Sequence, residues 1–261
     1  MRDIRVAGIL LLVGVISSTK GTDLCLAEMI ETFDTAVDPF PGAVYDNWSF
    51  VQSNGAARVV VTGENGVLEM RRTTTEYPPV TYAWATQTSL DLFGTSTFID
   101  RYPDGFSVAV DIGGTGGASN ALHGISIGNI AALPYLGYNG FRWRNLSSDA
   151  YVGSLLALGW TPSYATTTPH QQMVMHVEPD GVNYKLSVTL TEGSHLFSTT
   201  RTFTPAELGT LDKVGLYFRS AHTAGGAGLY DNFSVVPEPS ALLLLAAGLL
   251  TAMVARRRGN R

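Results

Sequence analysis

The chain has 261 residues, of which 45% are hydrophobic and only 15% are charged, and its formal net charge is −5. This acidic balance argues against a nucleic-acid partner, which requires a basic face. The single cysteine, Cys25, excludes a disulfide framework and a cysteine-rich zinc site.

The N-terminus has the layout of a secretory signal peptide. Residues 1–5 carry two arginines, residues 6–16 are apolar, and residues 17–19 are small and polar. The apolar run is shorter than the roughly 20 residues that a membrane-spanning helix needs. We therefore predict a signal peptide over residues 1–27, cleaved after Ala27 or further upstream. The alternative is a buried helix of a cytosolic fold.

Between residues 28 and 235, apolar and polar residues alternate repeatedly, which is typical of half-buried β-strands. Turn residues separate the runs at 64–66, 179–181 and 192–194. A short helical turn is predicted at 205–208, with Thr204 as its N-cap. In chain order, the predicted strands are 56–62, 67–73, 80–88, 106–112, 122–127, 141–145, 173–178, 184–190, 196–203, 214–219 and 228–236.

This succession of short strands predicts one all-β domain over residues 28–235, built as a two-sheet antiparallel sandwich. No repeat of 20–50 residues is visible in the sequence, which argues against solenoids and propellers. The fold class expected for the whole chain is therefore an all-β jelly-roll sandwich with an apolar segment at each end.

Several features of the domain resemble the concanavalin A-like, or laminin-G-like, jelly roll. They are Phe33-Asp34 with Trp48 following, the Pro-Asp-Gly turn at 179–181, and the closing segment 228–235. That family includes lectin-like binders, glycosidases and inert structural domains. The resemblance therefore implies a fold and does not imply one function.

The C-terminus combines three signals in a fixed order. Val236-Pro237-Glu238-Pro239 comes first, residues 240–255 are almost uninterruptedly apolar, and Arg256-Arg257-Arg258 follows. The apolar stretch is just long enough to cross a thin bilayer as a transmembrane helix. The arginines would hold its end in the cytoplasm and leave the β domain outside. The prolines are expected to separate this tail from the last strand.

This order resembles the PEP-CTERM sorting signal of exopolysaccharide-producing Gram-negative bacteria. In that family an exosortase, a membrane protease-transferase, reads the tail. The resemblance implies that residues 236–261 form a sorting and anchoring tail. It also implies export to the cell surface, outer envelope or extracellular matrix, with extracellular polysaccharide as a partner. A plain stop-transfer anchor is the alternative. The residues implied in sorting are Pro237, Glu238, Pro239, Arg256, Arg257 and Arg258.

No sequence pattern identifies a catalytic site. Residues 124–128 match the letters of a G-x-S-x-G nucleophile elbow but lack its strand–helix context, so we expect Ser126 to lie in a strand. Residues 178–183 fall short of the paired carboxylates of laminarinase-type glycosidases. The five histidines show no metal-ligand spacing, and residues 113–117 are expected to form a flexible loop. We therefore expect a non-enzymatic lectin-like or structural protein. A glycan-active hydrolase with unidentified carboxylates and a coat protein without a ligand are the alternatives.

Two patterns suggest ligands. Asp34 and Asp231 would lie close together if the terminal strands pair, as they often do in jelly rolls, and would then form a structural calcium site. Surface acids that cap loops are the alternative. Flat aromatic side chains could stack against sugar rings, although in a sandwich such residues often belong to the core. The candidates for glycan binding are Trp84, Trp143, Trp160 and Tyr138, of which Trp143 is flanked by Arg142 and Arg144 in a stretch expected to be rich in loops.

Overall fold

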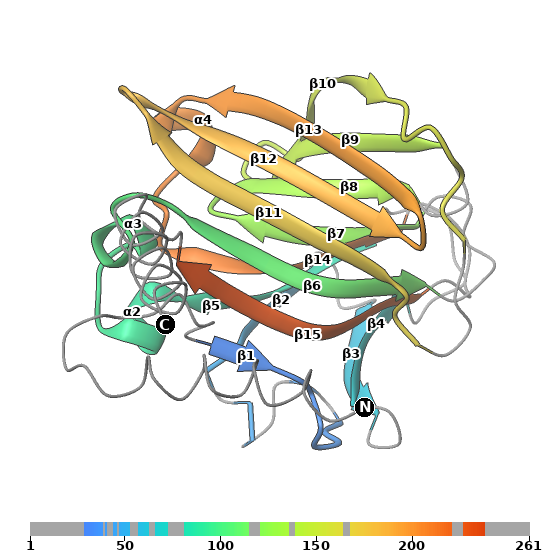
Figure 1. Cartoon of the computed structure of the whole chain (residues 1–261). Coiled ribbons are helices and arrows are strands. Elements are labelled where there is room, and N and C mark those ends of the chain that lie inside the picture. The colour runs from blue at the N-terminus through green and yellow to red at the C-terminus, as the bar shows by residue number, and fades with distance from the viewer. Residues whose placement is uncertain are drawn as a thin grey trace, which may run out of the picture. The chain divides into compact units, whose positions relative to one another are not determined.

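Two antiparallel β-sheets packed face to face make up the fold of this computed structural model (Figure 1). It describes residues 29–38, 40, 44–45, 47–52, 57–62, 66–72, 81–114, 121–135, 139–163, 168–220 and 227–237. These residues belong to one unit, Ala27–Glu238. The signal peptide predicted at 1–27 and the transmembrane helix predicted at 240–255 lie outside them. None of the helices within these ranges is both long enough and apolar enough to cross a membrane.

The elements follow one another closely along the chain. The strands are β1 (Met29–Glu31), β2 (Ser49–Gln52), β3 (Ala57–Thr62), β4 (Val67–Arg72), β5 (Thr81–Thr88), β6 (Phe106–Gly114), β7 (Ala121–Ile127), β8 (Ile130–Tyr135), β9 (Gly140–Asn145), β10 (Ala150–Leu156), β11 (Gln171–Asp180), β12 (Asn183–Glu192), β13 (His195–Phe203), β14 (Lys213–Ser220) and β15 (Ala227–Pro237), and the short helices are α2 (Ser89–Phe93), α3 (Phe98–Arg101) and α4 (Pro205–Leu208).

The strand order defines the two layers. The eight-stranded sheet runs β13-β12-β11-β6-β15-β4-β3, with β1 also paired to β15, and the seven-stranded sheet runs β10-β9-β8-β7-β14-β5-β2. In Figure 1 the strands β11, β12, β13, β6 and β15 lie in front of β7, β8, β9 and β14. About half of the strand pairings join strands that are not consecutive in sequence, so both sheets depend on non-local contacts.

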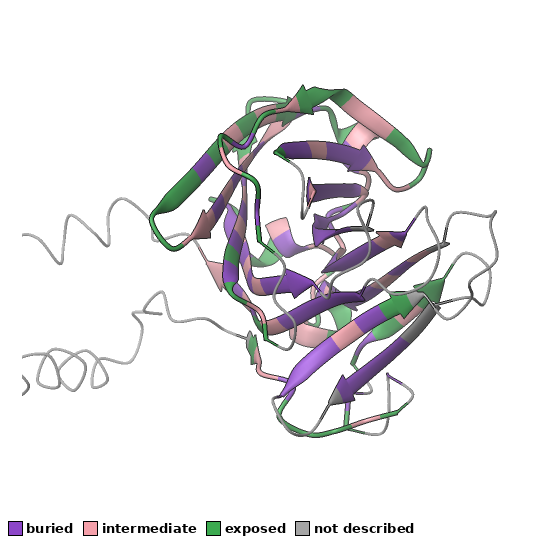
Figure 2. Cartoon of the chain, turned by 90° about the vertical axis from the view of Figure 1, so that its right-hand side faces the viewer, coloured by how far each residue is buried: buried purple, intermediate pink, exposed green. Residues whose placement is uncertain are grey.

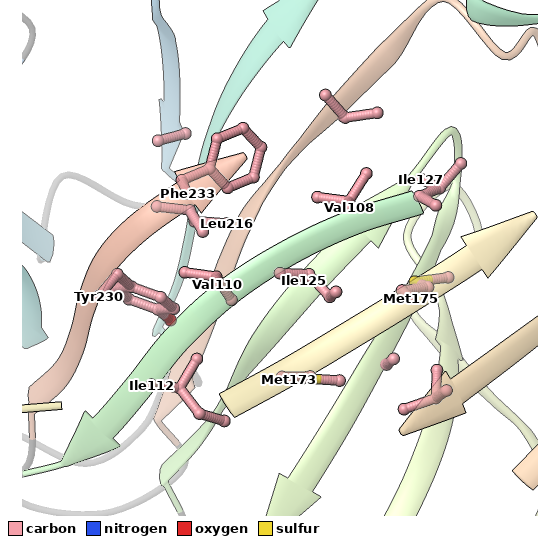
Figure 3. Packing of buried hydrophobic residues seen from close by; sticks show 14 of the residues in the cluster. Val108, Val110, Ile112, Ile125, Ile127, Met173, Met175, Leu216, Tyr230 and Phe233 are labelled. Carbon is pink, nitrogen blue, oxygen red and sulfur yellow. The ribbon is translucent and has the colours of Figure 1, made fainter. Parts of the chain in front are cut away.

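The core lies between the layers because each strand turns one apolar face inward. Buried and partly exposed positions alternate along β6 and β11, as the period of a strand requires (Figure 2). Figure 3 shows the result, with Val110 and Met173 from the eight-stranded sheet packed near Ile125 and Leu216 from the other sheet. Removing these side chains from water is the main force that holds the layers together.

The hairpins predicted from turn residues are confirmed. β11, β12 and β13 are consecutive antiparallel strands, with Gly181 and Gly193 at positive φ in the connecting turns. The short helix α4 also begins as expected. The Thr204 side chain accepts from the Glu207 backbone N–H, and the Glu207 carboxylate accepts from the Thr204 N–H, which completes a capping box.

β15 joins the two ends of the domain. It pairs with β6 on one side, and with β4 and then β1 on the other. The pairing of terminal strands expected for a jelly roll is therefore confirmed. Around this junction Phe33, Trp48 and Phe233 are buried, and the Trp48 ring lies 5.8 Å from Phe33 and 5.1 Å from Phe233.

The structure corrects several sequence expectations. β15 continues through Pro237, which pairs with Phe106, so the first proline of the tail belongs to the sheet. Proline is tolerated there because it ends the strand beyond the last residue paired with β1. Gly113 and Gly114 end β6 and do not belong to a loop, and much of the stretch 135–143 is strand. The strands β1, β2, β8 and β10 and the helices α2 and α3 were not predicted.

Candidate ligand-binding face

The seven-stranded sheet carries a second apolar cluster on the face that points away from the core. Its members alternate with core residues along their strands. On β14, for example, Tyr217 lies between the core residues Leu216 and Phe218. We call this group the outer cluster. It consists of buried Leu122, Ala131, Leu133 and Tyr217 with half-buried Tyr82, Trp84, Tyr135, Leu146 and Tyr151.

Aromatic rings stack at one side of the outer cluster. Tyr82 and Trp84 of β5 share a face because they are two residues apart in a strand. Their ring planes differ by 10° and their centroids are 5.5 Å apart. Trp84 pairs in register with Tyr217 of β14, and those rings are stacked at 6.2 Å. Trp84, one of the predicted sugar platforms, is thus half-buried and stacked with Tyr82 and Tyr217.

Three arginines surround Tyr151 at the other side of the outer cluster. The guanidinium carbons of Arg142, Arg144 and Arg219 lie 4.5, 4.9 and 5.8 Å from the centre of its ring. Tyr135 donates to the Tyr151 hydroxyl at 3.3 Å, and Arg219 Nη1 donates to the same oxygen at 3.2 Å. We call Arg142, Arg144 and Arg219 the arginine cluster.

Arg144 is the most buried member of the arginine cluster. Its side chain is 2% exposed, and its Nη2 donates to the backbone oxygen and the carboxylate of Asp149. Asp149 holds a positive φ of 53° in the turn before β10, which aspartate tolerates better than most residues. The turn therefore places one carboxylate against the guanidinium group of Arg144.

Two tyrosines of this face, Tyr135 and Tyr217, are held in the neutral form. Burial, followed by the hydrogen bond to Tyr151, raises the pKa of Tyr135 to about 12. Burial also raises the pKa of Tyr217 well above its ordinary value. Neither phenol can serve as a base near neutral pH, so these side chains offer contact surface and hydrogen bonds rather than proton transfer.

The other glycan candidates lie elsewhere. Trp143 is 3% exposed and packs between the sheets against Phe141 and Phe203, so it belongs to the core and cannot act as a sugar platform. The alternation of Arg142 and Arg144 around it is confirmed, because Trp143 points into the core and both arginines point outward. Tyr138 lies outside the described residues.

Trp160 belongs to a polar network beside the end of β12. Its ring stacks on His195, with centroids 5.3 Å apart, and its indole N–H donates to Glu192 at 2.9 Å. Glu192 also accepts from the backbone and hydroxyl of Ser163 and from Gln171. This network ties the connection between β10 and β11 to the β12–β13 hairpin.

The same network contains a serine, a histidine and a glutamate, but not in the geometry of a catalytic triad. His170 Nε2 lies 2.9 Å from Ser163 Oγ and 3.5 Å from Glu192, so one ring nitrogen faces both partners. A triad needs the acid on the other nitrogen, where it orients the ring. The Ser163 hydroxyl donates directly to Glu192, which makes the arrangement a structural clamp.

Glu192 is expected to make stability depend on pH. Burial raises the pKa of its carboxyl, but the hydrogen bonds from Ser163 and Trp160 outweigh burial and leave the pKa below its usual range. Because the folded state binds the proton less tightly than the unfolded chain, this stabilisation is present above the ordinary carboxyl pKa. It is lost as the pH falls through the lowered value. Glu192→Gln should cost about 1–2 kcal/mol at neutral pH, measured by urea unfolding.

Glu178→Gln is the control for this prediction. Glu178 lies on β11 near the turn of the β11–β12 hairpin, where it pairs with Lys185 at 2.5 Å but is 38% exposed. Exposed pairs of this kind contribute roughly 0–1 kcal/mol. Equal losses for the two variants, or an unchanged acid limb of the stability profile in Glu192→Gln, would contradict the assignment of Glu192 as a half-buried anchor of the network.

The G-x-S-x-G pattern has a structural explanation. Ser126 is 1% exposed on β7, as expected for a strand residue, and its hydroxyl donates to the Gly215 oxygen at 3.4 Å. Gly128 has a φ of 55° in the turn that leads to β8, so a hairpin follows the serine instead of a helix. The nucleophile elbow is therefore excluded.

Asp34 and Asp231 lie near the β1–β15 junction, close enough for the charge of Asp34 to affect the pKa of Asp231. Burial raises the pKa of Asp231, and the charges of Asp111 and Asp34 raise it further. A bulge in β15 brings Asn232 to Asp111, with Nδ2 donating to the carboxylate at 2.8 Å. Among the described residues, however, no group of three or more acidic, histidine or cysteine side chains is arranged to hold a metal ion.

Calcium at this junction therefore stays a prediction from the sequence, and Asp231→Asn tests it. If an ion bridges Asp34 and Asp231, chelation should lower the Tm of the protein and the variant should no longer respond to calcium, because a ligand bound only to the folded state stabilises it. If no ion binds, Asp231→Asn should instead leave stability unchanged or raise it, since it relieves repulsion from Asp111. A Tm that does not change in excess chelator would contradict the calcium prediction.

Comparison with solved structures places the domain among β-sandwiches. A GH43 glycoside hydrolase, described as an engineered endo-xylanase and exo-arabinofuranosidase, has a TM-score of 0.51 at 10% identity, over 85% of this chain and 42% of its own. Lectin UEA-II in complex with galactose has a TM-score of 0.47 at 12% identity, over 81% of this chain and 99% of its own. A Lotus tetragonolobus seed lectin has a TM-score of 0.49 at 9% identity, over 81% and 100%. At such identities the similarity concerns the fold.

Comparison of sequences bears on the C-terminus. No curated protein matches the chain significantly. A family profile described as the PEP-CTERM protein-sorting motif matches residues 235–258, which include all of the predicted sorting residues. The match begins inside β15 and continues beyond the described residues. The chain thus carries a PEP-CTERM sorting motif at its C-terminus, which implies an exported, surface-sorted protein processed by an exosortase.

Proposed function

We propose that the protein is a non-enzymatic carbohydrate-binding protein of the cell envelope or extracellular matrix, and that it binds polysaccharide through the outer face of the seven-stranded sheet. The observation that carries the proposal is a row of stacked rings, which we call the aromatic row, formed by half-buried Tyr82 and Trp84 and buried Tyr217. Aromatic rings combine a large apolar surface with fixed geometry, and they lose little conformational freedom when a flat ligand stacks on them.

The chemistry of this face supports binding over hydrolysis. Glycoside hydrolysis uses two carboxyl groups that flank the scissile bond. On the described strands of this sheet, the outward positions in register with Trp84 and Tyr217 carry no aspartate or glutamate. Asp149, in the turn before β10, is bound by Arg144. We therefore propose no catalytic residue.

The proposal is tested with the full-length protein in a polyoxyethylene detergent, by its retention in gels that contain polysaccharide and by assays of reducing-sugar release. Trp84→Ala should weaken retention about tenfold, the loss of ~1.4 kcal/mol. Leu196→Ala removes an exposed apolar side chain, 66% exposed, from the other sheet and should have no effect. Failure to bind any polysaccharide would favour a coat protein without a ligand, and steady release of reducing ends would favour the hydrolase.

A further inference from the structure

The outer face of the seven-stranded sheet carries a local positive charge, although the chain as a whole is acidic. The chain as a whole has a net charge of −5, yet Arg142, Arg144 and Arg219 gather around a single ring. Within the described part of the chain, Asp149 is the one carboxylate that pairs with any of them, and it pairs with Arg144. Like charges held this close repel each other, so an anion would be attracted to them.

The protein itself leaves most donors of the arginine cluster unused. The Nε atoms of Arg142, Arg144 and Arg219 are buried and make no hydrogen bond. Arg142 contacts Tyr151 through its ring face, and Arg219 donates to the Tyr151 hydroxyl. A guanidinium group has five N–H donors. Because Arg142 and Arg219 are only half-buried, their outer ends remain available to an acceptor from solution.

The same contacts fix the positions of the available guanidinium groups before any ligand arrives. Tyr151 holds Arg142 by a cation–π contact of 4.5 Å and Arg219 by a hydrogen bond of 3.2 Å. Arginine side chains otherwise lose about 2 kcal/mol of rotamer freedom when they are ordered. A site in which that order already exists binds a planar anion more tightly.

The arginine cluster lies next to the aromatic row on the same sheet. Arg219 pairs directly with Tyr82 across β14 and β5, and Tyr217, two residues before Arg219, pairs with Trp84. On a strand, residues two apart lie on the same face. A polymer that stacks a sugar ring on Trp84 therefore meets Arg219 and then Arg142 along the same face.

Resting on the function proposed above, we infer that the ligand of this face is an acidic polysaccharide whose sugar rings carry carboxylates, bound by the aromatic row through its rings and by Arg142 and Arg219 through its charge. A carboxylate matches the two parallel N–H groups of a guanidinium. A neutral glycan would cover the same arginines without supplying any charge to balance them.

The probe pair that tests this inference is polygalacturonate and its fully methyl-esterified form, which share one backbone and differ in charge. Binding of the full-length protein is measured in a polyoxyethylene detergent at 50 and 500 mM salt. The acid form should bind at least tenfold more tightly than the ester at low salt. Its advantage should shrink at high salt, where the charges are screened.

Variants then assign the effect to the arginine cluster. Arg142→Gln and Arg219→Gln should each lower affinity for the acid form about tenfold and leave affinity for the ester unchanged. Arg71→Gln removes a charge from a side chain that is 45% exposed on β4 and serves as the control. Arg142→Lys keeps the charge but loses the paired N–H groups of the guanidinium, so it should retain part of the affinity for the acid form. The Tm of each variant shows whether it is folded, and the comparison of acid with ester needs no variant.

Each outcome is decisive. Equal binding of acid and ester overturns the inference but leaves polysaccharide binding intact. Preference for the acid that survives in both glutamine variants also overturns it, because the charge would then act elsewhere. Failure of every polysaccharide to bind removes both the inference and the function on which it rests.

Discussion

Phe233→Ala is expected to destabilise the β domain by about 3–5 kcal/mol, the range for removing a buried phenylalanine ring. Phe233 is fully buried on β15 and its ring meets Trp48 edge to face at 5.1 Å. Loss of the ring would leave a cavity where the N-terminal segment packs against the last strand. Urea unfolding followed by tryptophan fluorescence would measure the effect, since Trp48 reports on this contact directly.

The turn between β11 and β12 offers a control for the phenylalanine variant. Val182→Ala changes a turn residue that is 84% exposed and should shift stability by less than about 0.5 kcal/mol. A loss below about 1 kcal/mol for Phe233→Ala would contradict the packing of this junction. It would mean that the segment before β3 is attached only loosely to β15.

The mature surface protein is expected to lack Arg256–Arg258 completely. The sorting motif spans residues 235–258, and an exosortase that acts near Pro-Glu-Pro would remove everything beyond it. Replacing Glu238 and Pro239 together by alanine should abolish this processing and keep the chain in the inner membrane. These two positions are chosen because Pro237 belongs to β15, so the double variant leaves the strand unchanged.

Mass spectrometry of the C-terminal peptide from the surface fraction would test the sorting prediction. The double variant, recovered from the inner membrane, should yield the peptide that ends at Arg261, and the natural sequence in the surface fraction should not. Surface protein that still carries Arg261 would show that the tail acts as an ordinary membrane anchor. Arg71→Gln, which changes a surface arginine of the β domain, should leave processing unaffected.

Alternation of apolar and polar residues was enough to locate strands that have one face in the core and the other face toward solvent. β11 and β12 follow the period of two over most of their length, and both were predicted within a few residues. β8 was missed because both of its faces are covered. Ile130–Pro134 is buried throughout, since the outer cluster lies on its second face, and alternation therefore disappears.

Other features lie beyond local sequence patterns. β1 and β2 are only three and four residues long and form through partners distant in sequence. Trp143 was expected to be a surface platform because it is a flat aromatic side chain in a stretch expected to be rich in loops. The stretch is instead part of β9, where neighbouring residues lie on opposite faces, so Trp143 points into the core while Arg142 and Arg144 point outward. Tyr82 and Tyr217, which the sequence analysis missed, could have been found from their spacing. Tyr82 lies two residues from Trp84 and Tyr217 lies two residues from Arg219, and residues two apart in a strand share a face.

Because β15 lies inside the eight-stranded sheet, this sheet cannot be completed until the chain has been made through residue 237. This strand follows all the other described strands along the chain, yet it lies inside its sheet, between β6 and the pair of β4 and β1. Until it arrives, the two halves of the eight-stranded sheet have no common neighbour. A polypeptide cut short before residue 227 would lack both the strand that unites these halves and the sorting motif that begins within it. Folding and delivery to the surface therefore both require the same few residues, and truncated products would fail at both steps.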